Sequence, residues 1–308
     1  MDGKLMAYEL RQLLNEEAGS NQLDDFTTFN LLNKGMARLN CRIRHVTKDQ
    51  SITTVADQTD YTLNADFINL YRKDAYGYRI IKYSDGTTMH NLRLTDEDAK
   101  FRNQTNETVT SVSIPESFSL VDDKTLDSQV TGTATSTVAK TAGKSTLNDS
   151  AGDFSDVSPH DVVHNTTDGS FGKVISKTSS TVLVVALFNG TNNDWTSGDA
   201  YVIQPGGRYK IVLDPPPSTG SETITVPYIA RPAPVYSDYD MIRIPDIYQE
   251  ALIYFAAGFY KYRDGEASFA NVWFTTAEEA VKRMVGDSIK ALHKRRVAVN
   301  MKRRQRNI

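Results

Sequence analysis

The chain has 308 residues, of which 39% are hydrophobic and 24% charged, so it is long enough for two core-forming units of ordinary globular composition. A single cysteine, Cys41, excludes an intrachain disulfide framework, and no run approaches the roughly 18 apolar residues of a membrane helix. The formal charge of −3 is uneven, because eight basic and no acidic residues follow Asp287, leaving 27 basic against 38 acidic residues, or −11, in the remainder.

Two helices are predicted at the start of the chain, over 5–14 and 26–43. An aspartate before the second helix, Asp24 or Asp25, can accept hydrogen bonds from its free amides. Apolar residues of this helix recur at intervals of three and four, which predicts one buried stripe. The stripe consists of Phe26, Phe29, Leu32, Met36, Leu39 and Ile43.

From Ser51 the pattern changes to that of strands. Apolar and polar residues alternate up to Asp85 and Gly86, a pair typical of a turn. The apolar positions include Ile52, Val55, Tyr61, Leu63, Tyr76, Tyr78, Ile80 and Tyr83. Thr95, with Asp98 three residues later, predicts a short helix after these strands.

The composition changes near Asp122, where Ser, Thr, Gly, Asp and Asn become dominant until Pro205. Short β-like runs in this region are separated by turn signals such as Asp168-Gly169 and Asn189-Gly190. Several short strands at this spacing fit a small barrel or sandwich. We therefore predict an inserted β domain, with the strands on either side of it belonging to one parent sheet.

After the insertion, two alternating runs flank a proline-rich turn. They are Tyr209, Ile211 and Leu213 before Pro215, Pro216 and Pro217, and Ile224, Val226 and Tyr228 after it. We predict that the two runs pair as a β-hairpin. Pro245 and Asp246 then predict the start of a helix that continues through Tyr260.

A last helix is predicted from Ala267 to Arg296, with an apolar stripe on one side. The stripe consists of Phe269, Val272, Trp273, Ala277, Ala280, Val281 and Met284. Beyond Gly286 the chain becomes a basic arm that carries Lys290, Lys294, Arg295, Arg296, Lys302, Arg303, Arg304 and Arg306. An arm of this charge is expected to meet nucleic acid or the acidic surface of a partner.

No constellation of residues predicts an enzyme. Gly143-Lys144-Ser145 imitates the end of a phosphate-binding loop, but Val138 stands where the first glycine belongs. Groups able to ligate a metal are Asp153, Asp156, His160, Asp161 and His164. Polar turns of a β domain account for these groups better than a metal site does. We therefore expect no catalytic, cofactor-binding or metal-binding residues.

Aromatic residues crowd the helix that follows Pro245. They are Tyr254, Phe255, Phe259, Tyr260 and Tyr262. Such rings can form a stacking platform for nucleic acid. The small residues 256–258 within the same helix favour a packed core or a subunit interface instead, because they let another helix approach closely.

The order of these segments resembles that of the head-to-tail connector (adaptor) proteins of tailed bacteriophages. The segments are FTTFNLLNKGMARLNCRIRHV, SITTVADQTDYTLNADFINLYR, IVLDPPP, YIARPAP and IPDIYQEALIYFAAGFYKYRDGE. The resemblance implies a homo-oligomeric ring of twelve copies that docks on the portal protein ring, helps to retain packaged DNA, extends the DNA exit channel and holds a tail or nozzle protein. It also places the protein in the virion neck, after assembly in the host cytoplasm.

The predicted fold class is α+β: a helical body with a β-hairpin sheet, an inserted small β-barrel or sandwich, and an extended basic C-terminal arm. The predicted domains are 1–121 and 207–286 for the body, 122–206 for the insertion and 287–308 for the arm. The arm is assigned to the portal or to genomic DNA, and the five aromatic residues to the ring interface. The alternative is a tail-tube, tail-completion or capsid-decoration protein whose β domain binds carbohydrate or protein. Neither reading involves a cofactor or a membrane.

Overall fold

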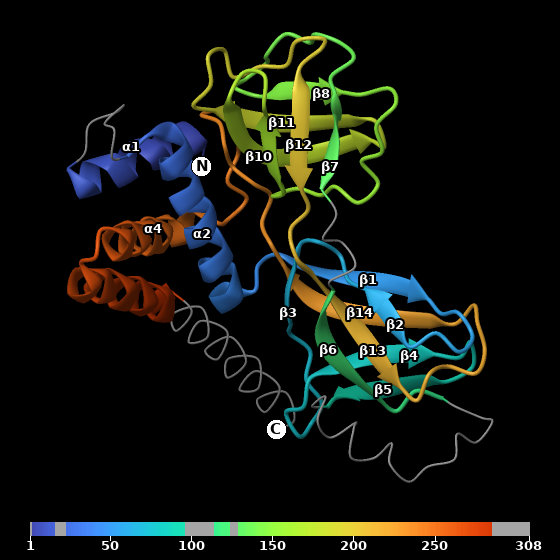
Figure 1. Cartoon of the computed structure of the whole chain (residues 1–308). Helices are drawn as coiled ribbons and strands as arrows, with labels where there is room; N and C mark the ends of the chain where they lie inside the picture. Colours follow the sequence, from blue (N-terminus) through green and yellow to red (C-terminus); the bar gives the residue numbers. More distant parts are fainter. Residues whose placement is uncertain (1, 16–22, 96–113, 124–128, 285–308) are drawn as a thin grey trace, which may run out of the picture. The chain divides into compact units, whose positions relative to one another are not determined.

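The computed structural model describes residues 2–15, 23–95, 114–123 and 129–284, and Figure 1 shows the arrangement of its helices and strands. The chain divides into two compact units. The helical unit consists of Met1–His45 and Val235–Ile308, and the β unit consists of Val46–Pro234.

The helical unit is built from segments at both ends of the chain. Its elements are α1 (Gly3–Leu14), α2 (Asp25–Ile43), the short 3₁₀ helix η1 (Asp246–Tyr248), α4 (Gln249–Arg263) and a helix over 267–284. α2 packs closely on α4, since a Cβ added at Gly35 would come within 3.0 Å of Leu252. The last helix packs just as closely, since a Cβ at Gly258 would come within 2.6 Å of Phe274. The small residues of α4 thus admit neighbouring helices, as predicted.

The helix starts follow the sequence signals. Oδ1 of Asp24 accepts a hydrogen bond from the backbone N–H of Thr27 at 2.7 Å, which confirms the predicted cap of α2. α1 ends at Leu14, where Asn15 adopts the left-handed conformation (φ 55°). Four residues of the predicted α2 stripe are buried: Phe29, Leu32, Met36 and Leu39.

An eight-stranded sheet forms one part of the β unit, in the order β1-β14-β4-β5-β6-β13-β2, with β3 paired to β14. Its strands are β1 (Thr47–Thr53), β2 (Asp60–Thr62), β3 (Phe67–Leu70), β4 (Ile80–Ser84), β5 (Met89–Leu94), β6 (Ser117–Asp123), β13 (Arg208–Asp214) and β14 (Thr223–Ala230). Alternate residues of these strands form one buried apolar cluster that includes Tyr61, Ile81, Phe118, Ile211 and Val226. Tyr76 and Tyr78, predicted to belong to a strand, lie before β4.

The hairpin predicted over 209–228 is wrong. β13 pairs with β6 and β2, whereas β14 pairs with β1, β4 and β3. Three strands therefore lie between β13 and β14 in the sheet. Alternation shows which residues of a strand are buried, but it carries no information about which strand is the partner.

The second sheet has six strands in the order β7-β12-β9-β10-β11-β8. They are β7 (Val130–Thr133), β8 (Ser145–Asn148), β9 (Val162–Asn165), β10 (Ser170–Ser179), β11 (Val182–Phe188) and β12 (Ala200–Gln204). The backbone N–H of Thr135, just after edge strand β7, donates to the carbonyl of Asn148 in edge strand β8 at 2.8 Å, which brings the two edges together. Trp195 and Tyr201 are fully buried in the core that the sheet encloses. We call this sheet and its connections, residues 129–206, the inserted sheet.

The inserted sheet interrupts the eight-stranded one. β6 and β13 are antiparallel neighbours, with Ser117 opposite Asp214 and Asp123 opposite Arg208. The chain leaves the parent sheet at the end of β6 and returns directly opposite, as expected for an insertion between two strands of one sheet. The exact domain boundaries stay a prediction.

The predicted fold class is wrong in its balance. The described residues are mostly β, with fourteen strands in two sheets, and the longer unit is built from these strands rather than from helices. A hairpin was predicted where a full sheet exists, because the sheet depends on pairs between distant segments, such as Thr47 opposite Ile229. The short helix predicted over 95–102 and the basic arm lie outside the described residues, apart from Thr95.

Among the described residues, none of the helices combines the length and the apolar character that crossing a bilayer requires.

Candidate functional site

The structure describes the predicted aromatic residues but not the predicted arm. The eight basic residues of the arm lie outside the described part of the chain. The aromatic residues lie on α4: Phe255 and Tyr260 are buried within the helical unit, Tyr254 and Phe259 are half-buried, and Tyr262 is 66% exposed. Their role at a ring interface stays a prediction, and Tyr262 is the one best placed for it.

Three helices of the helical unit, α2, α4 and the last helix, meet around one arginine. The guanidinium carbon of Arg38, on α2, lies 4.4 Å from the ring centre of Phe274 and 5.3 Å from that of Phe255. Cation–π contacts of this kind each contribute about 0.5–2 kcal/mol, depending on exposure. Glu278 accepts a hydrogen bond from Nε of Arg42 at 2.8 Å, which links the last helix to α2 again. These contacts join α2, α4 and the last helix within the helical unit.

The last helix exposes part of its predicted apolar stripe. Ala277, Ala280 and Val281 are buried as expected. Phe269 and Val272, however, are 62% and 60% exposed, so this part of the stripe is not covered within the protomer. The described part of the helical unit exposes eight large hydrophobic side chains, namely Leu5, Tyr8, Tyr239, Met241, Ile247, Tyr262, Phe269 and Val272. These side chains come from several segments of the unit, and singly exposed apolar side chains are common on protein surfaces.

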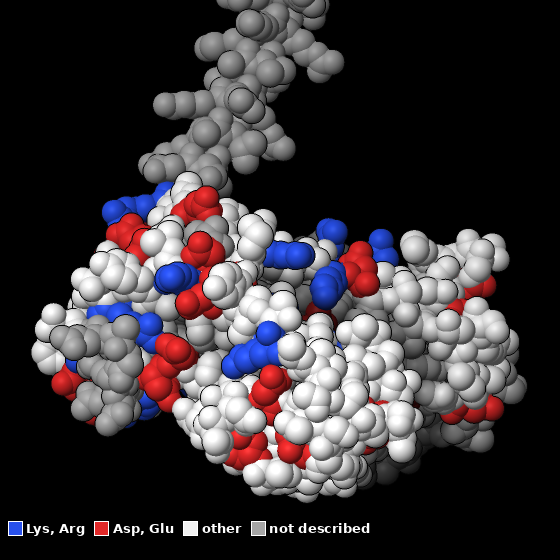
Figure 2. Space-filling view, turned by 90° about the horizontal axis from the view of Figure 1, so that it is seen from above, with Lys and Arg blue, Asp and Glu red and all other residues white. Residues whose placement is uncertain are grey.

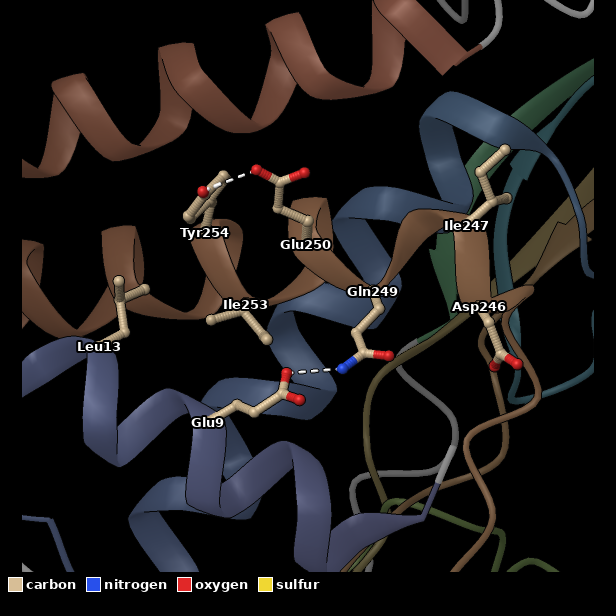
Figure 3. A pocket seen from close by; sticks show the side chains of 8 residues that line it. All are labelled: Glu9, Leu13, Asp246, Ile247, Gln249, Glu250, Ile253 and Tyr254. Carbon is tan, nitrogen blue, oxygen red and sulfur yellow. Dashed lines mark hydrogen bonds between the residues drawn. The ribbon is translucent and has the colours of Figure 1, made fainter.

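A groove of about 460 Å³ lies between α1 and the region of η1 and α4 (Figure 3). We call it the acidic groove. Its lining is formed by Glu9, Leu13, Asp246, Ile247, Gln249, Glu250, Ile253 and Tyr254. Three of these eight side chains are carboxylates, and none of these described residues is a lysine or an arginine. The lining therefore combines negative charge with apolar side chains.

Two carboxylates of the acidic groove are held in place. Nε2 of Gln249 donates to Oε2 of Glu9 at 2.6 Å, and the hydroxyl of Tyr254 donates to Oε1 of Glu250 at 2.8 Å (Figure 3). The bond to Glu250 raises the pKa of the Tyr254 hydroxyl, with burial as the second cause. Glu9 and Asp246 lie far apart in the sequence, so no local pattern could have revealed the groove.

A second distinctive surface lies in the β unit, in the segment between β3 and β4. Oδ1 of Asp74 accepts hydrogen bonds from the backbone N–H groups of Tyr76 and Tyr78, both at 2.9 Å. Lys73 and Arg79 form an antiparallel bridge below this turn. We call residues 72–79 the Tyr–Arg hairpin.

The side chains at the tip of the Tyr–Arg hairpin point into solvent. Tyr76 is 79% exposed and Tyr78 is 56% exposed. The guanidinium carbon of Arg93, on β5, lies 5.7 and 5.6 Å from the centres of these two rings. Nε of Arg93 also lies 3.1 Å from Oδ2 of Asp74, which fixes the arginine beside the turn. The exposed tyrosines are thus held by a rigid base.

Basic residues surround this hairpin. Arg72, Lys73 and Lys82 line a hollow of about 460 Å³ on the outer face of the sheet, together with Asp49 and Asp74. Arg79 and Arg93 add two further positive charges beside it. The surface is therefore net positive and aromatic. The composition of residues 71–79, YRKDAYGYR, could have indicated this surface from the sequence.

Charges of both signs occur elsewhere on the molecule. Figure 2 shows a face on which small groups of acidic and basic side chains are interspersed. The acidic excess of the body is therefore not gathered on this face.

Two of the residues able to ligate a metal, Asp161 and His160, have hydrogen-bond partners within the protein. Oδ2 of Asp161 accepts from the N–H of Ser158 at 2.8 Å, and Oδ1 accepts from the N–H of Gly206 at 2.8 Å. Nε2 of His160 lies 3.1 Å from the carbonyl oxygen of Pro232. Burial, with the nearby charge of Arg231, lowers the pKa of His160 to about 4. The described residues contain no group of three or more His, Cys, Asp or Glu side chains able to hold a metal ion.

The segment that imitates a phosphate-binding loop is a tight turn. The backbone N–H and carbonyl groups of Thr141 and Lys144 bond to each other, at 2.9 and 3.0 Å. The two residues between them, Ala142 and Gly143, both have positive φ angles, of 51° and 74°. This geometry is that of a two-residue hairpin connection, which leaves no cradle for a phosphate.

Comparison with known families gives the decisive observation. Residues 91–304, more than half of the chain, match the family described as SU10 adaptor protein. The chain belongs to the SU10 adaptor protein family. It is therefore a bacteriophage adaptor protein and a component of the virion. No curated protein gives a significant match to the chain.

The family match bears on the role of the chain and on most of its length. An adaptor has a structural role, which points away from catalysis. The matched residues of the adaptor include the inserted sheet, β13, β14, α4 and the last helix. They also include seven of the eight basic residues of the arm, all except Arg306.

Proposed function

We propose that this adaptor is the head-to-tail connector of a tailed phage. It assembles as a ring of twelve copies on the portal protein ring, helps to retain the packaged DNA, extends the DNA exit channel and offers its far surface to a tail or nozzle protein. The observation that carries the proposal is the family match, which continues to residue 304 and so covers most of the basic arm.

The basic arm is the part that docks on the portal. Three apolar residues, Val297, Val299 and Met301, stand between its two basic clusters. Lysine and arginine alone would suffice for binding to DNA phosphates, whereas apolar side chains add affinity only where a protein surface buries them. Each arm contributes a weak contact, and the ring multiplies it because all arms act at once.

Co-sedimentation with the purified portal ring of the same phage tests this proposal. The full chain is expected to bind, and a chain ending at Asp287 is expected to lose binding. A matched pair of full-length variants separates the two kinds of contact. One carries serine at Val297, Val299 and Met301, and the other carries serine at Lys302, Arg303 and Arg304.

Loss of binding in the apolar variant supports docking on protein. If the basic variant alone loses binding, and that binding also disappears when DNA is removed, the arm is a DNA contact instead. If the full chain does not bind the portal at all, the connector proposal is overturned.

A further inference from the structure

We propose that the Tyr–Arg hairpin of one copy docks into the acidic groove of a second copy, and that this contact joins neighbouring subunits. The inference rests on the ring of the proposed function. It assigns the two surfaces that the ring uses, of which the predicted aromatic interface on α4 contributes only Tyr254.

The hairpin has the composition and the rigidity of an interface anchor. Tyrosine and arginine are enriched among the residues that dominate binding energy at protein interfaces. The carboxylate of Asp74 fixes the backbone at Tyr76 and Tyr78, and Arg93 lies beside both rings, so docking the hairpin costs less conformational entropy than docking an unstructured loop. Two aromatic rings at 79% and 56% exposure gain most of their burial only when a partner covers them.

The acidic groove complements the hairpin in charge. Glu9, Asp246 and Glu250 meet a surface that carries five basic side chains and two acidic ones. The five basic residues are Arg72, Lys73, Arg79, Lys82 and Arg93, and the two acidic ones are Asp49 and Asp74. Opposite potentials of this kind steer association and fix its register.

The groove also complements the hairpin in size and polarity. Its volume of about 460 Å³ leaves room for a tyrosine ring, and Leu13, Ile247 and Ile253 supply apolar contacts. Ile247 is 58% exposed, so the groove gains burial as well. Hydrogen bonds from Gln249 and Tyr254 hold two of its carboxylates ready to receive a guanidinium group.

A ring requires two such surfaces on one chain. In a head-to-tail ring each subunit contacts its neighbours through two different patches that complement each other, whereas a two-fold dimer uses one patch twice. The hairpin and the groove are different, opposite in charge and present on the same chain. They therefore meet the requirement for a heterologous contact between copies.

The same observations favour a protein over DNA as the partner of the hairpin. It exposes two tyrosine rings, whose apolar area is buried by a protein surface and not by the phosphates of a duplex. Nε of Arg93 lies 3.1 Å from Oδ2 of Asp74, so the carboxylate offsets part of the arginine's charge.

Cross-linking of full-length chains on the portal ring tests the contact directly. In a background with Cys41→Ser, one set of chains carries Tyr76→Cys and another carries Ile247→Cys. Both positions are more than half exposed, so neither change disturbs the core. Mixed rings are expected to form Tyr76→Cys to Ile247→Cys disulfides under mild oxidation. The control replaces Tyr76→Cys by Met89→Cys, at a residue of similar exposure (63%) at the other end of β5, and is expected to give none.

Charge reversal supplies a second, independent readout. Arg72→Glu with Lys82→Glu, and Glu9→Lys with Glu250→Lys, are each expected to weaken association between copies at least tenfold, and mixing the two variants is expected to restore it. Sedimentation velocity measures association, and fluorescence anisotropy with a DNA duplex measures DNA binding.

The outcomes separate this inference from the proposed function. Portal binding without cross-links or charge rescue overturns the contact and leaves the connector proposal intact. Loss of DNA affinity in the Arg72→Glu, Lys82→Glu variant, with association unchanged, makes the hairpin a DNA site and also overturns the inference. Absence of portal binding by the wild-type chain overturns the connector proposal itself.

Discussion

The inserted sheet and the helical unit differ in what they leave exposed. In the described residues, the inserted sheet exposes no large hydrophobic side chain, whereas the helical unit exposes eight. The inserted sheet buries Trp195, Phe154 and Tyr201 completely, or nearly so, in its own core. The inserted sheet therefore buries its large apolar side chains in its own core, whereas the described part of the helical unit leaves eight such side chains exposed.

One acidic side chain of the inserted sheet, that of Asp168, stabilises a neighbouring turn. Asp168 accepts hydrogen bonds from the backbone N–H groups of Thr191, Asn192 and Asn193 at 3.0–3.1 Å. Burial acts to raise the pKa of Asp168, but these bonds outweigh it and hold the pKa below its usual value. The comparison shows that the inserted sheet buries its large apolar side chains in its own core. The proposals above divide the roles accordingly, with assembly assigned to the helical unit and the Tyr–Arg hairpin.

The largest expected effect is on the core of the inserted sheet. Trp195 is 0% exposed and packs edge-on against Tyr201, with ring centres 6.3 Å apart. Trp195→Ala is expected to destabilise the inserted sheet by about 3–5 kcal/mol, because it leaves a large cavity. Trp195→Phe is the control, with a smaller loss. Hydrogen exchange measures whether the loss stays within residues 129–206, and equal loss of protection in α2 and α4 contradicts the division of roles.

Titration of His160 is expected to change the free energy of unfolding by up to about 3 kcal/mol between acidic and neutral pH. Its pKa is about 4 in the folded protein and 6.5 normally, so the unfolded chain binds the proton more strongly. Stability is therefore complete above pH 6.5 and is lost as the pH falls towards 4. Denaturant unfolding of wild type and His160→Gln across this range measures the effect. A constant difference between the two proteins at every pH excludes this role of His160.

A smaller loss in the free energy of unfolding, about 1–2 kcal/mol, is expected when Arg38 of the helical unit is replaced by alanine. Arg38→Ala removes the cation–π contacts to Phe255, Phe259 and Phe274. Thermal unfolding is expected to show a loss confined to the helical unit. Lys34→Ala, an exposed position on the same helix, is the matched control and is expected to change little. Equal effects of the two variants would mean that the aromatic contacts add nothing.

The smallest effect on stability is expected where the exposed side chains of the helical unit are changed. Tyr262→Ser, Phe269→Ser and Val272→Ser each remove an exposed apolar group, so the free energy of unfolding is expected to change by less than about 0.5 kcal/mol. Assembly on the portal is nevertheless expected to weaken, as measured by sedimentation of the loaded ring. Unchanged assembly in all three variants would show that these residues make no contact that matters for assembly on the portal.

Local features of the fold could be predicted from the sequence. Asp24 caps α2, four of the six residues of its apolar stripe are buried, and turns occur at Gly86 and Gly169, where φ is positive. These features depend on residues close together in the chain. The inserted β region was also recognisable, because its composition differs from that of its neighbours.

Features that depend on distant segments could not be predicted. Adjacency in sequence predicts that β13 and β14 pair as a hairpin, yet their partners include β1 and β6. Phe269 and Val272 lie on a regular stripe but are left exposed, because periodicity does not show how much of a stripe a neighbouring helix covers. The acidic groove requires Glu9 and Asp246 to meet, which no spacing indicates.

The most direct test of the division of roles is portal binding by a chain without the inserted sheet. Asp123 and Arg208 lie opposite each other on β6 and β13, so a two-residue Asn-Gly turn can replace residues 124–207. This variant is expected to bind the portal ring as the full chain does, while the chain ending at Asp287 does not. The opposite result, a folded variant that no longer binds beside a truncated chain that still does, would contradict the account.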